Sequence, residues 1–178
     1  MTPRLVTPRL ILRAHRAEDF PAMADMWADP VVTRFILGPP SSAEATWSRL
    51  LRYAGHWQML GYGYWALECR ETGAFLGEAG LADYHRAFDP PEAVSAPEAG
   101  WVLAARAHGR GLATEAVAAV LAWADATLAA PATCAIFAPE HGASVAVARK
   151  LGFGADRMTV YNGNPTLRLD RPRAVTSP

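Results

Sequence analysis

The segment ARAHGRGLATEA, from Ala105 to Ala116, constrains the fold of this chain more than any other. The residues before it, Ala99–Leu103, have the pattern of a short strand, and after it apolar residues recur at helical spacing from Leu112 to Leu128. Gly109 and Gly111 lie between the two, where the chain needs backbone angles that glycine adopts readily. The sequence therefore predicts a strand, a tight glycine turn and a long helix, in that order.

The predicted turn is a candidate anion site. The first turn of a helix leaves backbone N–H groups without partners at the positive end of the helix dipole. A pyrophosphate is a natural occupant of such a site, and a side chain at Gly109 or Gly111 would hold the ligand away from the backbone. For two glycines alone, a tight turn that binds nothing remains the alternative.

Two other nucleotide-binding patterns do not fit this turn. A dinucleotide-binding fold has the pattern G-x-G-x-x-G, with an acidic residue about 20 positions further on. Here Thr114 stands at the third glycine position, and the next acidic candidate, Asp125, lies within the predicted helix. A loop of the type G-x-x-x-x-G-K-[ST] has a lysine directly after the second glycine, whereas the only lysine of this chain is Lys150.

The rest of the chain alternates between strand-like and helix-like patterns, which predicts an α/β fold with a mixed sheet. No repeat or linker divides it, so we expect one domain over residues 1–178, with a loose tail from residue 172. We expect six or seven mostly antiparallel strands, at 10–13, 64–69, 74–81, 99–103, 133–137, 158–161 and 166–169. About four helices, at 17–27, 41–54, 112–128 and 143–151, are expected to cover both faces of the sheet.

The second of these helices opens with a capping box, Ser41-Ser42-Ala43-Glu44. Its residues predicted to face inward are Trp47, Leu50, Leu51 and Ala54.

Charge and hydropathy exclude several classes of protein. The 17 basic and 17 acidic residues cancel, so no long-range field attracts nucleic acid or an anionic membrane. The sequence contains no run of about 18 apolar residues, the length that could cross a bilayer, and its first residues lack the apolar stretch of a signal peptide. Cys69 and Cys134 are far apart, which indicates buried thiols in a reducing compartment. We therefore expect a cytoplasmic protein without a nucleic-acid or membrane partner.

The histidines and arginines say little about the function of the chain. His15, His56 and His85 lack the spacing of metal ligands, so no metal site is predicted. Arginine supplies 16 of the 17 basic residues, as a GC-rich coding sequence would, so an isolated arginine receives little weight.

Several motifs together resemble the GNAT N-acetyltransferases. Residues Arg106 to Gly111 match the pattern Q/R-x-x-G-x-G/A, and PEHGASVAVARKLGF at 139–153 resembles the family segment E-N-x-A-S-x-R-V-x-E-K-L-G-F. The segments TPRLILRAHRAEDF, DPVVTRFI, GAFLGEAGL and EAGW are similar to the branch of the ribosomal-protein N-terminal alanine acetyltransferases, the Rim type. The resemblance covers nearly the whole chain in the right order. It implies a GNAT-like acyl-CoA N-acyltransferase fold and an acetyl-CoA-dependent N-acetyltransferase.

The resemblance also implies which residues bind acetyl-CoA. In the family the turn binds the pyrophosphate through backbone N–H groups, the strand before it pairs with the pantetheine arm, and an N–H there receives the thioester oxygen. An asparagine that anchors the pantetheine amide is His141 here, which either simply replaces it or doubles as a proton carrier. The implied set is Val102, Leu103, Arg106, His108, Gly109, Arg110, Gly111, Leu112, Ala113, Thr114 and His141.

Two further residues are implied in catalysis. An amine acceptor arrives largely protonated and needs a base. Glu98 matches the acidic residue that precedes G-[YW] in this branch, and alternation places it on the face shared with Gly100 and Val102. The tyrosine that many relatives use as general acid is Ala148 here, so Ser144 is the predicted donor to the leaving thiolate.

The acceptor is left open between a peptide N-terminus and a small-molecule amine, and the family also covers amino acids, polyamines and amine antibiotics. Among Phe35, Trp47, Trp57, Tyr62, Tyr64 and Trp65, about two are expected to line the acceptor pocket. The chain could be a monomer or a homodimer. A CoA-binding sensor or interaction module without turnover is the alternative function.

Overall fold

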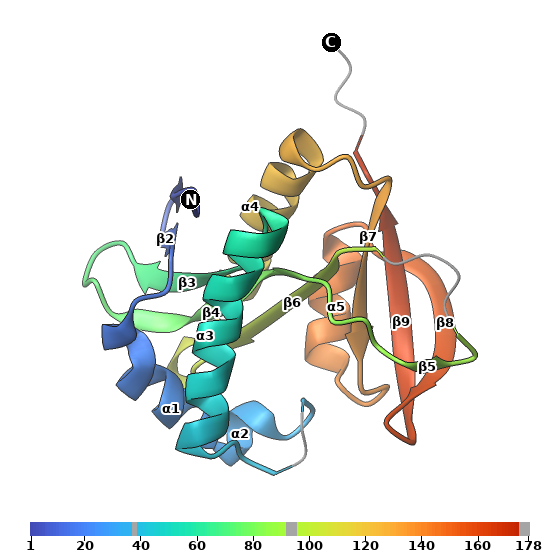
Figure 1. The fold of residues 1–178 in the computed structure, drawn as a ribbon, viewed down its shortest axis with the longest axis horizontal. Helices are drawn as coiled ribbons and strands as arrows, with labels where there is room; N and C mark the ends of the chain where they lie inside the picture. Colours follow the sequence, from blue (N-terminus) through green and yellow to red (C-terminus); the bar gives the residue numbers. More distant parts are fainter. Residues whose placement is uncertain (37–38, 92–95, 175–178) are drawn as a thin grey trace.

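The computed structural model describes residues 1–36, 39–91 and 96–174. Its strands form one sheet in the order β1-β2-β3-β4-β6-β7-β9-β8-β5 (Figure 1). Neighbouring strands are antiparallel except β6 and β7, which run parallel. The strands are Leu5–Val6 (β1), Leu10–Arg13 (β2), Tyr64–Cys69 (β3), Phe75–Ala82 (β4), Phe88–Asp89 (β5), Glu98–Leu103 (β6), Ala132–Phe137 (β7), Gly154–Tyr161 (β8) and Asn164–Pro172 (β9).

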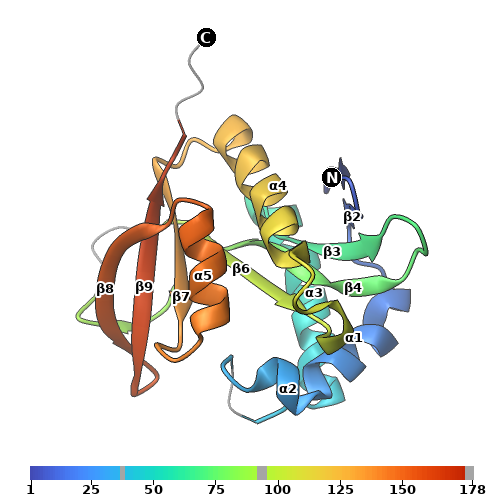
Figure 2. The ribbon, with the colours of Figure 1, turned by 180° about the vertical axis from the view of Figure 1, so that it is seen from behind.

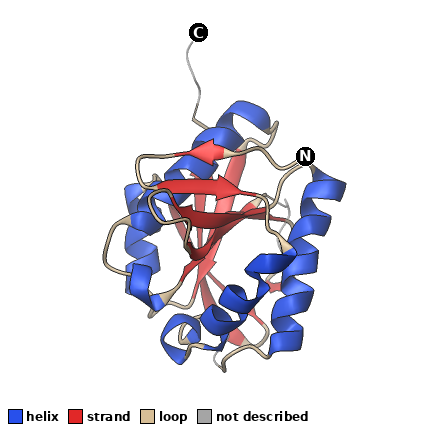
Figure 3. Ribbon diagram, turned by 90° about the vertical axis from the view of Figure 1, so that its left-hand side faces the viewer, coloured by secondary structure: helices blue, strands red, loops and turns tan. Residues whose placement is uncertain are grey.

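The α-helices cover both faces of this sheet. They are Phe20–Ala28 (α1), Pro30–Thr33 (α2), Ala43–Leu60 (α3), Leu112–Thr127 (α4) and Gly142–Lys150 (α5), with short 3-10 turns at Ala17–Asp19 and Ala105–Ala107. Helices α1 and α3 lie on the face seen in Figure 1, and α4 and α5 lie on the face seen in Figure 2. Figure 3 shows the strands between the two groups of helices. No helix in the described ranges is long and apolar enough to cross a membrane.

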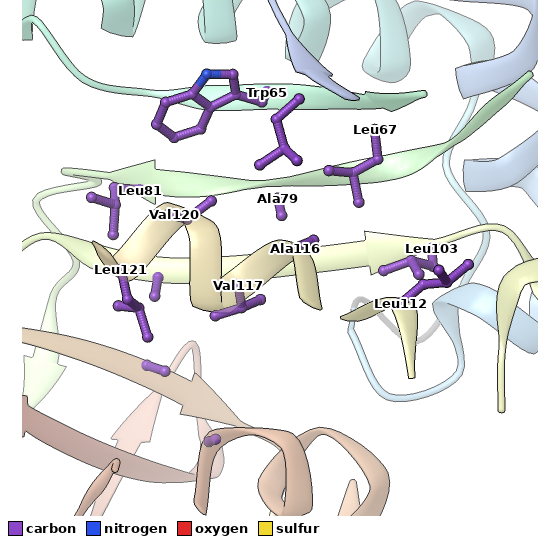
Figure 4. Close-up of a cluster of buried hydrophobic side chains, with 14 of the residues drawn as sticks. Trp65, Leu67, Ala79, Leu81, Leu103, Leu112, Ala116, Val117, Val120 and Leu121 are labelled. Atoms are coloured by element: carbon purple, nitrogen blue, oxygen red, sulfur yellow. The ribbon is translucent and has the colours of Figure 1, made fainter. Parts of the chain in front are cut away.

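Each face of the sheet has its own core. Ala116, Val117, Val120 and Leu121 of α4 are buried and face the side chains that the sheet presents, among them Trp65 (Figure 4). On the opposite face the buried residues of α1, with Leu50 and Tyr53 of α3, pack against the other alternate residues of the strands, whereas Trp57 of α3 belongs to the first core. That second core includes Met23, Met26, Trp27, Leu50, Tyr53, Tyr64, Ala66 and Val102.

The predicted mixed α/β fold is confirmed, with three additions. Strands β1 and β5 have two residues each and helix α2 has four, so none of them is long enough to show a periodic pattern. The predicted tail begins too early, because Pro172 ends β9 and the N–H of Arg173 donates to the carbonyl of Pro131 at 2.9 Å. Residues 175–178 of that tail lie outside the described residues.

Of the four residues predicted to face inward from α3, only Leu50 is buried. Trp47 and Leu51 are exposed, by 40% and 53%. The buried residues of this helix are Thr46, Leu50, Tyr53 and Trp57. The apolar face of α3 is wider than its contact with the sheet: it extends from Tyr53 and Trp57 to Trp47 and Leu51, and that contact decides which part of the face is buried. The capping prediction needs one change: Ser42 is the N-cap, and its hydroxyl accepts from the N–H of Ala45 at 3.1 Å.

Candidate active site

Strands β6 and β7 pair at one position, Glu98 with Cys134, and then spread apart (Figure 1). A cavity of about 870 Å³ opens beside the spread strands. Residues of α3, such as Arg52 and Tyr53, line it on one side of the sheet, and Ser144 of α5 lines it on the other. Two molecules that approach from opposite faces could therefore meet in this cavity.

The alternation of β6 decides which backbone groups face the opening. The N–H of Cys134 donates to the carbonyl of Pro97 at 3.0 Å, so odd-numbered residues of this segment direct their backbone groups toward β7 and even-numbered residues direct theirs toward β4. Trp101 and Leu103 thus present backbone groups at the opening. This corrects the prediction for Val102, whose backbone groups bond β4 and whose side chain lines the cavity.

The glycine turn has the predicted shape. Gly109 and Gly111 have φ angles of 71° and 74°, in the left-handed region that favours glycine. The first hydrogen bond of α4 runs from the N–H of Glu115 to the carbonyl of Gly111 at 3.2 Å. Within the described structure no backbone acceptor takes the N–H groups of residues 109–114, which include Arg110, Leu112, Ala113 and Thr114. These six groups form the candidate anion site.

His108 and Arg106 do not fit their predicted roles as directly. The N–H of His108 already donates to the carbonyl of Ala105 at 3.1 Å, which removes it from the set of available donors. Its ring Nε2 lies 2.8 Å from the carbonyl oxygen of Leu103, so the imidazole folds back onto β6. The guanidinium of Arg106 donates to the carbonyl of Phe75 on β4.

Sequence reasoning missed Arg9, which lies at the turn. Its Nη1 donates to the carbonyl of Arg110 at 2.7 Å, and its Nε donates to Glu115 at 2.6 Å. A Cβ built on Gly111 would lie 3.6 Å from its Nη2. Arg9 and Glu115 are 106 positions apart, so no local pattern could reveal this cation beside the anion site.

Glu98 is a buried carboxylate in the cavity, only 8% exposed. Its two oxygens accept hydrogen bonds from Arg86, at 2.6 Å from Nε and 2.7 Å from Nη2. The guanidinium of Arg86 also lies 4.5 Å from the ring centroid of Tyr84 and 4.6 Å from that of Tyr161. The sequence indicated the carboxylate and its face but gave no sign of this partner.

His141 and Ser144 contact each other at the start of α5, with 3.1 Å between His141 Nε2 and the Ser144 hydroxyl oxygen. The ring of Phe35, which follows α2, stacks on His141 with 4.9 Å between centroids. Burial, followed by the nearby His108, lowers the pKa of His141 below its ordinary value of 6.5. His141 is therefore predominantly neutral at pH 7.

Of the six aromatic candidates, Phe35 and Tyr64 line the cavity. A Cβ added at Gly100 would overlap the hydroxyl of Tyr64, so only glycine fits at this position of β6. Trp57 and Trp65 belong to the core, as predicted for most of the set. Tyr84, which also lines the cavity, was not among the candidates.

The structure brings Glu98, Val102, His141 and Ser144 to one cavity, while the glycine turn lies at the far end of β6, outside the walls of that cavity. No group of three or more metal-ligating side chains occurs in residues 1–36, 39–91 and 96–174. A mixed, mostly antiparallel sheet covered by helices on both faces is the fold that the sequence resemblance implied.

A model of the acetyltransferase (GNAT) domain matches residues 9–154. The chain therefore belongs to the GNAT acetyltransferase family.

Solved structures agree with this assignment. An acetyltransferase from Agrobacterium tumefaciens is 29% identical, with a TM-score of 0.82, over 96% of this chain and 94% of the other. A protein from Bordetella pertussis assigned to the GnaT family is 28% identical, with a TM-score of 0.82, over 95% and 99% of the two chains. RimL, a ribosomal L7/L12 alpha-N-protein acetyltransferase in complex with coenzyme A, shares the fold at 18% identity, with a TM-score of 0.75 over 94% and 96%.

Proposed function

We propose that this GNAT acetyltransferase transfers the acetyl group of acetyl-CoA directly to a primary amine, on a peptide N-terminus or a small molecule. The observation that carries the proposal is the open edge of β6, which lies between a glycine turn with available N–H groups and the buried carboxylate of Glu98. The coenzyme A in the RimL structure supports the choice of acyl donor.

The residues at the open edge suit acetyl-CoA. The N–H groups of residues 109–114, with Arg9 beside them, would bind the pyrophosphate. The backbone groups of Trp101 and Leu103 would pair with the pantetheine arm, and one of their N–H groups would donate to the thioester oxygen. That bond strengthens as the oxygen gains negative charge, which lowers the barrier rather than only tightening binding. His141 would supply one hydrogen bond where relatives use an asparagine amide.

The residues near Glu98 suit the acceptor. Each oxygen of Glu98 bonds Arg86 and keeps a second lone pair, so the carboxylate can still take a proton from the acceptor ammonium, directly or through a water. The amine nitrogen then bonds the carbonyl carbon, the C–S bond breaks, and the sulfur leaves as a thiolate. The nitrogen loses its second proton to solvent as the amide forms. Ser144 would donate a hydrogen bond to that thiolate.

A calorimetric titration with acetyl-CoA tests the proposal. We expect micromolar binding to the native protein and its loss in a variant that carries Gly109→Asp and Gly111→Asp, because added carboxylates repel the pyrophosphate. Aspartate adopts positive φ angles more readily than most residues, so the variant can keep the turn. A lack of heat with the native protein would overturn the proposal.

A CoA-binding module without turnover is the second candidate. Two observations favour it: Arg86 engages both oxygens of Glu98, and Ala148, at the family tyrosine position, is fully buried in the core. Release of free thiol in the presence of an amine would exclude this candidate.

A further inference from the structure

The acceptor side of the cavity carries an excess of positive charge. Four arginines line the cavity, Arg34 after α2, Arg49 and Arg52 on α3, and Arg86. Arg86 is neutralised by Glu98. The other three have no ion pair with a carboxylate in the described parts of the chain.

Aromatic rings rather than carboxylates hold these three side chains. The guanidinium carbon of Arg49 lies 3.6 Å from a ring centroid of Trp27, and that of Arg52 lies 5.5 Å from the centroid of Tyr84. Arg34 lies 4.9 Å from the ring of Phe35. An aromatic face orients a guanidinium without cancelling its charge, and it leaves the N–H groups at the edge of the guanidinium able to bind a carboxylate or phosphate.

Nearby carboxylates do not offset this charge. Glu140 is the second carboxylate in the cavity wall, and it precedes α5, on the opposite side from α3. Glu78 is fully buried behind the wall, where it accepts from Tyr53 at 2.5 Å and from Trp27 at 3.2 Å. One buried carboxylate against three cations leaves the acceptor side net positive.

We propose that the acceptor is an amine that also carries an acidic group, a carboxylate or a phosphate, which binds Arg34, Arg49 and Arg52 while the nitrogen lies near Glu98. This inference rests on the proposed acetyl transfer. It disfavours the polyamines among the acceptors of this family, because a second ammonium group would approach unpaired guanidinium groups. A single arginine in a sequence rich in arginine says little, and it is the convergence of three in one cavity that carries the inference.

Matched acceptors test the proposal. With acetyl-CoA saturating, thiol release is compared for three amidated peptides, Ala-Asp-Asp-Ala, Ala-Asn-Asn-Ala and Ala-Lys-Lys-Ala, and for the small amines aspartate, asparagine amide, in which both carboxyl groups are amides, and spermidine. We expect kcat/KM for the acidic acceptors to exceed that of their amide counterparts by about tenfold, and that of the cationic ones by about a hundredfold. The preference should shrink when salt rises from about 0.05 M to about 0.5 M. The peptide and small-molecule pairs separate the two sources of the acidic group.

Variants of the arginines test whether these side chains cause the preference for acidic acceptors. Arg34 and Arg52 are exposed, so Arg34→Gln with Arg52→Gln should fold normally, abolish the preference for acidic acceptors and leave the affinity for acetyl-CoA unchanged. Arg4→Gln, an exposed arginine near the N-terminus and outside the cavity, is the matched control. Calorimetric binding of the acidic and amide peptides to the protein with CoA gives the same comparison without turnover.

Equal rates or equal binding for Asp and Asn acceptors, or a preference for spermidine, would overturn the inference. Failure to bind acetyl-CoA would instead overturn the proposed function.

Discussion

Arg86 holds Glu98 through two hydrogen bonds, 2.6 and 2.7 Å long, at the point where β6 and β7 still pair. The pair links the loop after β4 to the first residue of β6. The carboxylate is thereby oriented toward the cavity, while one lone pair on each oxygen stays available. The proposed base is thus positioned by a side chain 12 residues earlier in the chain.

Replacement of Glu98 by glutamine should slow acetyl transfer without weakening acetyl-CoA binding. The amide keeps the size of the carboxylate but cannot accept a proton, so we expect kcat to fall by about 10²- to 10³-fold. Steady-state kinetics and calorimetry measure the two quantities. Glu140→Gln, which removes the other carboxylate of the cavity wall, is the control. An unchanged kcat for Glu98→Gln would remove Glu98 from the mechanism.

Replacement of Arg86 by glutamine should destabilise the protein by more than the loss of one hydrogen bond would. Glu98 would remain buried without a cation, which costs about 3 kcal/mol of the free energy of unfolding. Urea denaturation measures the change. The double variant with Glu98→Gln should recover part of the loss, because no buried charge is then left unpaired. Equal loss in the single and double variants would show that the stacking of Arg86 on Tyr84 and Tyr161, and not the ion pair, carries the effect.

Gly100→Ala should destabilise the protein through a clash with the hydroxyl of Tyr64. Forcing one extra carbon into a packed site costs about 1–3 kcal/mol of the free energy of unfolding. Adding Tyr64→Phe removes the oxygen that the new methyl group meets, so the pair should be more stable than Gly100→Ala alone. Thermal unfolding of the three variants checks this. A double variant that simply adds the two single losses would contradict the assigned contact.

The stability contributed by His141 should depend on pH. Its pKa is lowered by burial and by His108, so the unfolded chain binds a proton here at a higher pH than the folded protein does. Stability is therefore full above the ordinary value of 6.5 and decreases as the pH falls from there through the lowered folded-state pKa. His141→Asn, the residue that relatives use, should remove this component of the pH dependence. A proton NMR titration that places the pKa of His141 at or above 6.5 would refute the assignment.

Local patterns sufficed where a feature depends on neighbours in sequence. The strand, glycine turn and helix at 99–128 follow from alternation, two glycines and helical spacing, and the structure has β6, positive φ angles and α4 there. The placement of Glu98 on the face of β6 shared with Val102 follows from the two-residue period of a strand. The helix at 43–60 shows the limit, because its apolar face is wide and packing against the sheet selects Tyr53 and Trp57 over Trp47 and Leu51.

The fold class, the order of the longer elements and the carboxylate that faces the cavity could be predicted from the residues, because these depend on short-range periodicity and on motifs that stand whole in the chain. The folded molecule was needed to show that Arg86 holds Glu98, that Arg9 lies beside the glycine turn, and that three arginines converge on the acceptor side. Such contacts join residues from separate elements. Packing around a shared sheet sets the distances between their charged groups, and no local pattern encodes that packing.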